Sequence, residues 1–465
     1  MTAELLPFDP ERMVADAALT RAEDRARGCA KPIRLVGSTV ELDTTTGEVL
    51  RTYSSDDELD GYTYVRCGNR RASVCPSCSR EYKGDAWHLL ACGLAGGRDI
   101  PESVADHPAT FGTVTAPSFG SVHRRARKKR GAKAARCQPR RDRPMCDHGR
   151  PAYCGKAHHD DDPQVGQPLC WQCYDYTGHV LWQWHAPELW RRLTIALQRQ
   201  LAHMAGIGIT RFRKLAKVSF VKVVEFQARG IIHVHAPIRL DGPEGPTTPP
   251  VVQLTTDQLG QAFRAAAESV ALEVPGPDNT TVILRWGRQI DTRPITGDAD
   301  REGNTGPAHP HQVAAYLGKY LTKSTEDFGL PEKIRSATDA RLAGASPHAV
   351  RIIQTATALA RVDESYARLR DRLATLGYRG HPITKSRRYS ITFGTLRRAR
   401  SDYRRRRARL EPGAHVRDVL DPEPTDLADD TTVLILRDWT FEGVGYLDSF
   451  TAVMAVESAT QARSR

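Results

Sequence analysis

One stretch, Ile231-Ile-His-Val-His-Ala-Pro-Ile238, sets the architecture expected for this 465-residue chain. Its Val and Ile content predicts a β-strand, in which successive side chains point to opposite faces. His233 and His235 therefore share one face, and Val234 points to the other. Two neutral imidazoles that converge on one point can bind a metal ion, whereas two histidines in a half-buried strand would be the simpler interpretation.

The preceding strand supplies a possible third ligand, Glu225. A strand is predicted from Val218 to Phe226, followed by Gln227-Ala-Arg-Gly230. If Ala228-Arg-Gly230 is a three-residue loop with Gly230 in the left-handed conformation, Glu225 pairs with His233. Glu225 then lies on the face that carries both histidines. A two-residue turn would place the carboxylate on the opposite face.

A helix predicted over Gln312–Lys323 carries a second group of polar residues. Tyr316 and Lys319 lie at i and i+3 on one helical face, and Tyr320 follows Tyr316 at i+4. Taken alone, this pattern is typical of an amphipathic helix that packs its tyrosines against a sheet.

The order of the predicted elements indicates an α+β fold, with an antiparallel sheet and helices packed against it. Further strands are predicted at Thr110–Thr115 and Thr281–Ile290, and further helices at Tyr82–Leu94, Leu181–Leu201, Thr256–Leu272 and about 348–376. We expect four regions. They are an N-terminal zinc-ribbon-like module (1–95), a core (105–330) with a basic, Cys-rich insertion (120–178), a helical basic region (331–410), and an acidic linker with a small β-rich end (411–465).

Basic residues are concentrated in two runs, which indicates a polyanionic partner. Lys and Arg number 67 against 55 Asp and Glu, and eleven basic residues lie in 124–143. Clustered arginine is typical of nucleic-acid binding, although a solvated surface would also account for it. The candidate DNA-binding residues are Arg124, Arg125, Lys128, Lys129, Arg130, Arg404, Arg405 and Arg406.

Several classes of protein are disfavoured by what the chain lacks. It has no signal peptide at its start and no apolar run long enough to span a bilayer, so we expect a cytoplasmic protein without a membrane partner. It also has no phosphate-binding G-x-x-x-x-G-K-[ST] motif, which argues against an ATP-driven motor.

Ten cysteines in a reducing compartment favour metal binding over disulfides. Two C-x2-C knuckles, Cys75-Pro-Ser-Cys78 and Cys170-Trp-Gln-Cys173, suggest two structural zinc ions. The first ion would use Cys67 and, preferably, Cys29, with Cys92 and His88 as competing fourth ligands. The second set is expected to be Cys146, Cys154, Cys170 and Cys173, with Cys137, His148, His158 and His159 nearby.

Three motifs in order resemble those of the HUH endonucleases that initiate rolling-circle replication. They are Phe111-Gly-Thr-Val-Thr115, His233-Val-His235 and Val313-Ala-Ala-Tyr-Leu-Gly-Lys319. The chain more closely resembles the RepSA-type plasmid replication initiators of actinobacteria, through Arg66-Cys-Gly-Asn-Arg-Arg71, 174–182 and 323–329. The first motif departs from the family at Gly112 and Val114, where larger aliphatic residues are common.

The resemblance implies an antiparallel HUH-nuclease core that nicks one strand at a plasmid origin. Tyr316 would be the nucleophile, with Lys319 beside it and Tyr320 as a possible second tyrosine. His233, His235 and Glu225 would hold Mg²⁺ or Mn²⁺, of which imidazole ligands favour Mn²⁺. The product would be a 5′-phosphotyrosine and a free 3′-hydroxyl primer. The implied partners are single-stranded or hairpin origin DNA and the host helicase and DNA polymerase.

Three other functions fit parts of the pattern. A HUH transposase or relaxase would use the same chemistry in another element. A non-catalytic zinc-ribbon regulator would account for the charge and the cysteines but not for the histidine and tyrosine motifs. A zinc hydrolase would use Glu225, His233 and His235 without needing Tyr316.

Overall fold

The computed structural model describes residues 26–125, 135–159, 161–298, 306–321, 325–410, 433–447, 453 and 457. The chain forms two compact units. We call Trp87–Ile391 the central unit, and Met1–Ala86 together with Thr392–Arg465 the terminal unit. This division differs from the four expected regions, because segments from both ends of the chain belong to the terminal unit.

The central unit is built on a five-stranded antiparallel sheet. Its order is β10 (Ile383–Lys385), β5 (Lys217–Phe226), β6 (Ile232–Asp241), β4 (Ala109–Thr115) and β9 (Ile290–Ile295). All four neighbouring pairs are antiparallel. The mixed α+β class and the antiparallel sheet expected from the sequence are therefore confirmed.

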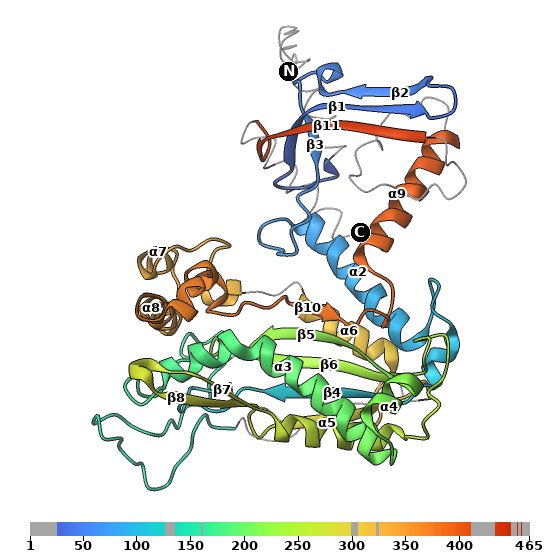
Figure 1. Ribbon diagram of the computed structural model, residues 1–465. Coiled ribbons are helices and arrows are strands. Elements are labelled where there is room, and N and C mark those ends of the chain that lie inside the picture. The colour runs from blue at the N-terminus through green and yellow to red at the C-terminus, as the bar shows by residue number, and fades with distance from the viewer. Residues whose placement is uncertain are drawn as a thin grey trace, which may run out of the picture. The chain divides into compact units, whose positions relative to one another are not determined.

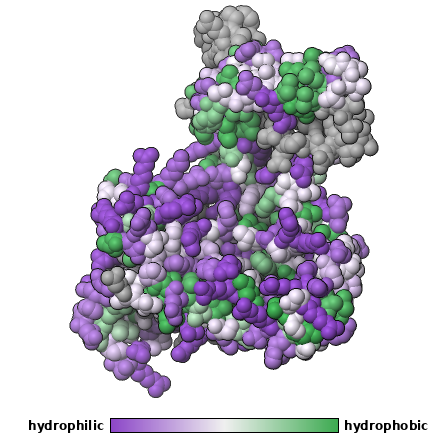
Figure 2. Space-filling model, in the orientation of Figure 1, coloured by the Kyte–Doolittle hydropathy of each residue, from purple (hydrophilic) through white to green (hydrophobic). Residues whose placement is uncertain are grey.

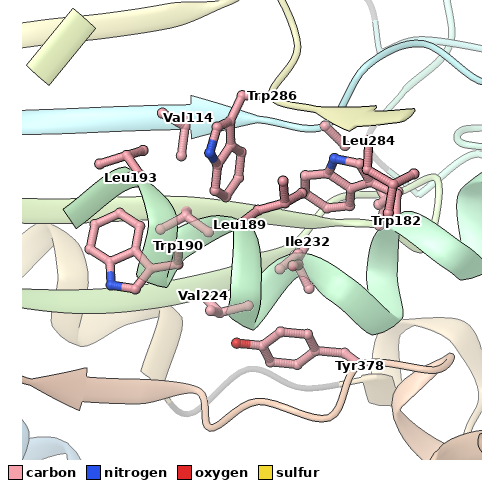
Figure 3. Packing of buried hydrophobic residues seen from close by; sticks show 14 of the residues in the cluster. Val114, Trp182, Leu189, Trp190, Leu193, Val224, Ile232, Leu284, Trp286 and Tyr378 are labelled. Carbon is pink, nitrogen blue, oxygen red and sulfur yellow. The ribbon is translucent and has the colours of Figure 1, made fainter. Parts of the chain in front are cut away.

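Two helices, α3 (Tyr176–Met204) and α5 (Thr256–Ser269), pack against one face of this sheet. Figure 3 shows Val114, Val224 and Ile232 of three neighbouring strands facing Leu189 and Leu193 of α3. All five side chains are buried. Helix α6 (Pro310–Leu321) contacts β5, and its tyrosines lie against the opposite face, which carries the histidines.

Smaller elements complete the central unit. The helices are α4 (Ile209–Leu215), α7 (Ala337–Leu342) and α8 (Pro347–Val362), and β7 (Ala271–Pro275) pairs with β8 (Thr281–Arg285). Figure 2 shows hydrophilic side chains over most of the visible face, with apolar side chains in small separate patches. Within the described part of the chain, no helix is both long and apolar enough to cross a bilayer.

Two elements predicted as continuous are divided in the structure. The strand expected over 281–290 becomes β8 and β9, because Gly287 donates its N–H to Thr115 O at 2.7 Å between them. A Cβ at Gly287 would lie 2.6 Å from Ala116 O, so only glycine fits this approach. The helix expected over 348–376 ends at Val362 and continues as 3₁₀ turns over Glu364–Thr375.

The terminal unit is a second antiparallel sheet with two helical segments. Strand β1 (Ile33–Asp43) pairs with β2 (Val49–Ser54), with β3 (Thr63–Val65) and, along its whole length, with β11 (Val433–Val444). Helix α2 (Pro76–Ala95) starts in this unit and ends in the central unit. Helix α9 (Phe393–Leu410) is held to the first part of α2 by Arg400, which pairs with Glu81 and Asp85.

Candidate active site and metal-binding clusters

The hairpin between β5 and β6 places Glu225 on the histidine face. Glu225 pairs directly with His233 in the strand register. The loop has three residues, since Gln227 N–H donates to Ile231 O at 2.9 Å and Gly230 N–H donates to Gln227 O at 2.8 Å. Gly230 has φ +77°, the left-handed conformation that the expected loop requires. Glu225 therefore lies on the same sheet face as His233 and His235, as the three-residue loop predicts.

His235 is held at both ring nitrogens. Its Nε2 lies 3.3 Å from Glu225 Oε2, and its Nδ1 lies 3.1 Å from Thr113 Oγ1 on β4. The ring is 4% exposed and stacks on Phe111 at a centroid distance of 5.6 Å. Thr113 was not singled out from the sequence, and only the pairing of β4 with β6 brings it to this histidine.

His233 lies beside His235 and has a ring nitrogen without a hydrogen-bond partner. Its centroid lies 4.5 Å from that of His235, and its Nδ1 is buried without a hydrogen-bond partner. Burial lowers the pKa of His233 to about 3, with smaller contributions from His235 and Arg229. The imidazole is therefore neutral near pH 7, the form that binds metal ions.

Helix α6 carries the two tyrosines to this face. The Tyr316 ring lies 5.3 Å from His235, 5.9 Å from Phe111 and 5.0 Å from Tyr320, and the side chain remains 42% exposed. Burial, followed by the Tyr320 hydroxyl and the Glu225 charge, raises the pKa of Tyr316 above its usual value. Lys319 Nζ lies 5.9 Å from the Tyr320 ring centroid. The structure thus brings all six predicted catalytic and metal-binding residues to one side of the sheet.

The hairpin loop is anchored by residues that the sequence did not single out. Arg229 donates to Pro117 O at 3.0 Å and to Ala116 O at 3.3 Å, just beyond β4. His348 Nε2 donates to Arg229 O at 3.0 Å. Burial lowers the pKa of His348 to about 4, so this imidazole is neutral near pH 7. These contacts fix the loop whose length sets the position of Glu225.

Close packing on the sheet face opposite the histidines explains why residue 112 is a glycine. A Cβ at this position would lie 2.7 Å from the ring of Phe263 on α5. Phe263 is fully buried, as is Val114, its neighbour in the core. The aromatic ring therefore occupies the space that a larger side chain at position 112 would need.

An open groove of 2310 Å³ runs beside the candidate catalytic residues and is rich in arginine. Glu225 and Tyr320 contribute to its lining. The exposed arginines that line it come from the insertion and from the segment around β8, and they are Arg124, Arg125, Arg136, Arg150, Arg285 and Arg288.

The other predicted DNA-binding residues lie outside what the structure describes. Lys128, Lys129 and Arg130 fall between the described ranges 26–125 and 135–159. Arg404, Arg405 and Arg406 belong to α9, but their side chains are outside the described part.

Cys29, Cys67, Cys75 and Cys78 come together in the terminal unit as a group that could hold a metal ion. The sulfur of Cys29 lies 3.8 Å from that of Cys75 and 3.7 Å from that of Cys78. A tetrahedral zinc ion with Zn–S bonds of about 2.3 Å separates its sulfurs by roughly 3.8 Å. Of the three competing fourth ligands, the structure therefore selects Cys29; Cys92 and His88 lie elsewhere on α2.

The expected second zinc set requires a correction. The structure groups Cys146, Cys170 and Cys173 with His148, whose Nδ1 lies 3.3 Å from Cys173 Sγ. Cys154 instead belongs to a separate group with His123, Cys137 and His158. The knuckle spacing located Cys170 and Cys173, but the folding of the loops around them selects their partners.

Among the described residues, these three groups are the ones whose ligand atoms lie within 4.8 Å of one another. Glu225, His233 and His235 are not among them: Glu225 contacts His235 at 3.3 Å, while His233 Nδ1 is buried without a hydrogen-bond partner. The three Cys and Cys/His groups are compatible with zinc.

Comparison with known proteins identifies relatives along nearly the whole chain. A family model described as "Replication initiator protein, pSAM2" matches residues 15–460. A replication initiator protein of Streptomyces ambofaciens is 40% identical over 464 residues, covering 97% of this chain and 92% of that relative. No solved structure matches the chain.

Proposed function

This chain belongs to the replication initiator family, and on that premise we propose that it nicks one DNA strand at a plasmid origin with Tyr316 as the nucleophile. The observation that carries this proposal is the position of Tyr316. Its ring lies 5.3 Å from His235 and is still 42% exposed, so that a DNA strand can reach it.

The reaction is a transesterification at one phosphodiester. The Tyr316 oxygen attacks phosphorus, the bond from phosphorus to the 3′ oxygen breaks, and the phenolic proton is lost while the 3′ oxygen gains one. The products are a 5′-phosphotyrosine and a free 3′-hydroxyl. The new ester preserves the energy of the broken bond, so the strand can later be rejoined. The raised pKa of Tyr316 means that the phenol needs help to lose its proton.

Glu225, His233 and His235 are the residues that would hold a divalent ion, Mg²⁺ or Mn²⁺. The unpartnered Nδ1 of buried, neutral His233 and the carboxylate beside His235 fit such a ligand set. Bound there, the ion would polarise the scissile phosphate and neutralise charge that develops on it. Lys319, one helical turn from Tyr316, would bind a phosphate oxygen. We assign Tyr320 a packing role, because its ring lies against both Tyr316 and His235.

The arginine-rich groove is the proposed path of the origin DNA. Its arginines would bind backbone phosphates, and Glu225 and Tyr320 in its lining connect it to the reaction centre. The free 3′-hydroxyl would prime a host DNA polymerase, with a host helicase opening the duplex. The cysteine group of the terminal unit and the Cys146 group would each hold a structural zinc ion.

A covalent-adduct assay tests the proposed nucleophile. The full chain is incubated with end-labelled, single-stranded origin DNA and Mn²⁺, and the products are separated on a denaturing gel. We expect a shifted protein–DNA band in the wild type and in Tyr320→Phe, and none in Tyr316→Phe. Loss of the band only in Tyr320→Phe would move the nucleophile to Tyr320. Cleavage without an adduct, unaffected by Tyr316→Phe, would instead indicate a hydrolase.

A further inference from the structure

The insertion of the central unit contains a group of four potential metal ligands that includes neither of the C-x2-C knuckles. The group consists of His123, Cys137, Cys154 and His158, whose four ligand atoms all lie within 4.8 Å of one another. His158 Nε2 lies 3.1 Å from His123 Nδ1 and 3.3 Å from Cys154 Sγ, and Cys137 Sγ lies 3.9 Å from His123 Nδ1. Ligands of a tetrahedral zinc ion are separated by roughly 3.3 to 3.8 Å, so these separations are close to those of a two-thiolate, two-imidazole site.

The ligands of this group have hydrogen-bond partners of the kind that metal ligands have in proteins. Asp162 Oδ2 lies 2.7 Å from His158 Nδ1, which leaves Nε2 facing the thiols. A carboxylate behind an imidazole in this way orients a ligating histidine and raises its basicity. The backbone N–H of Arg124 donates to Cys137 Sγ at 3.1 Å, as amides do to ligating thiolates. His158, Cys137 and Cys154 are each at least 92% buried.

Regular structure is scarce around these residues. The described part of the insertion before α3 is connected by isolated bridges, such as Gln138 with Cys154 and Arg125 with His158. Buried side chains here are mainly those of the ligands themselves. A segment without its own apolar core commonly relies on a metal ion to hold its loops together.

The ligands are adjacent in sequence to the arginines of the groove. His123 immediately precedes Arg124 and Arg125, and Arg136 immediately precedes Cys137. All three arginines are exposed and line the groove that also contains Glu225. An ion bound by the four ligands would therefore fix the backbone from which these arginines extend, through His123 beside Arg124 and Arg125 and through Cys137 beside Arg136.

We propose that His123, Cys137, Cys154 and His158 bind a third zinc ion, and that this ion holds Arg124, Arg125 and Arg136 on the wall of the DNA-binding groove. The metal site stands on its own geometry, while its role in DNA binding rests on the proposed function. The chain would then carry three structural zinc ions rather than the two indicated by its C-x2-C knuckles.

Zinc content tests the site without reference to activity. The purified full chain should contain three zinc ions per molecule by elemental analysis, Cys137→Ser should contain two, and the control Cys92→Ser, which alters a buried thiol outside all three groups, should contain three. Two ions in the wild type, or three in Cys137→Ser, would overturn the proposal.

A ligand exchange keeps the test valid if Cys137→Ser fails to fold. His158→Cys replaces an imidazole with a thiolate and should retain three ions. After substitution with Co²⁺, its spectrum should gain thiolate charge-transfer intensity over the wild type. An unchanged spectrum would show that residue 158 is not a ligand.

DNA binding tests the role of the ion. Each phosphate contact adds about 0.7 to the salt dependence of single-strand affinity, so losing three arginines from the wall should lower the slope by about 2. We expect this reduction in Cys137→Ser and not in His158→Cys or Cys92→Ser. An unchanged slope in a Cys137→Ser protein with two zinc ions would leave the metal site standing and overturn its role in DNA binding. Neither result depends on whether Tyr316 is the nucleophile.

Discussion

At the scale of single residues, the orientation of His235 is the most constrained feature of the candidate site. Both of its ring nitrogens have protein partners, and its two faces lie near Phe111 and the tyrosines. The Thr113 hydroxyl can either donate or accept, so it holds Nδ1 in either tautomer of the ring and keeps Nε2 directed toward Glu225. Thr113 is therefore a positioning residue for the proposed metal ligand.

Replacing Thr113 with valine should weaken the response to metal without removing the nucleophile. We expect Thr113→Val to need about ten- to a hundredfold more Mn²⁺ for half-maximal adduct formation, since the hydrogen-bond partners of metal ligands contribute to metal affinity on that scale. The measurement is a titration of adduct yield against Mn²⁺. Thr113→Ser keeps the hydroxyl and should titrate like the wild type. Equal metal requirements in all three proteins would contradict the assigned role.

At the scale of secondary-structure elements, one hairpin loop controls the composition of the site. Its three residues place Glu225 on the same face as His233, and a loop one residue shorter would turn the carboxylate away. Gly230 makes the loop possible through its positive φ, while Arg229 and His348 anchor it. The hairpin is thus a structural element that also sets the geometry of the candidate site.

Gly230→Ala should disturb the site more than a comparable glycine substitution elsewhere. An alanine with positive φ costs about 1 kcal/mol, and at position 230 its Cβ would also lie 3.0 Å from Ile352 Cδ1 and 3.1 Å from Leu376 Cδ1. We expect unfolding to become about 2 kcal/mol easier in urea and adduct formation to slow on the order of tenfold.

The matched control is Gly206→Ala, at φ +66° with no atom within 4 Å of the added Cβ. It should cost about 1 kcal/mol for the backbone conformation alone and leave adduct formation unchanged. If the two variants lost the same stability and activity, the hairpin loop would have no special role.

At the scale of the whole molecule, the chain is divided between a central unit and a terminal unit formed from both ends. Strand β11 pairs along the length of β1, nearly four hundred residues earlier in the sequence (Figure 1). All of the candidate catalytic residues and the groove lie in the central unit. The last part of α2 is bonded into that unit, since Tyr389 donates to Leu90 O at 3.2 Å and Ser390 donates to Leu89 O at 2.7 Å.

A fragment covering residues 80–391 should therefore fold and form the tyrosine adduct with a short single strand. It retains the central sheet and the part of α2 that is bonded to it, and it omits both strands of the β1–β11 pair together. We expect its adduct yield on a short oligonucleotide to be within about threefold of the full chain, because a local site keeps its geometry when its supporting elements stay intact. Circular dichroism establishes folding, and the gel assay measures the adduct. A folded fragment without adduct would show that the terminal unit completes the site.

Much of the central unit could be predicted from local patterns. The alternation of 231–238 places His233 and His235 on one face, because alternation depends only on neighbouring residues. Glu225 joins them only with a three-residue loop, the loop length that the structure shows. The i, i+3 and i+4 spacing likewise placed Tyr316, Lys319 and Tyr320 on one helix. The break at Gly287 leaves no local signal in the sequence, because it arises from a close approach to the end of β4, which is distant along the chain.

The sequence by itself determined the α+β class, the residues of the candidate site and three members of the first cysteine group, Cys67, Cys75 and Cys78, since periodicity, alternation and short ligand spacing are local properties. The tertiary structure selected Cys29 as the fourth member. Only the tertiary structure decided that Thr113 contacts His235, that Cys154 joins His123 rather than the Cys170 knuckle, and that β11 completes the sheet of β1. These pairings join segments far apart in the chain. They depend on how loops close and strands dock, which no local pattern records.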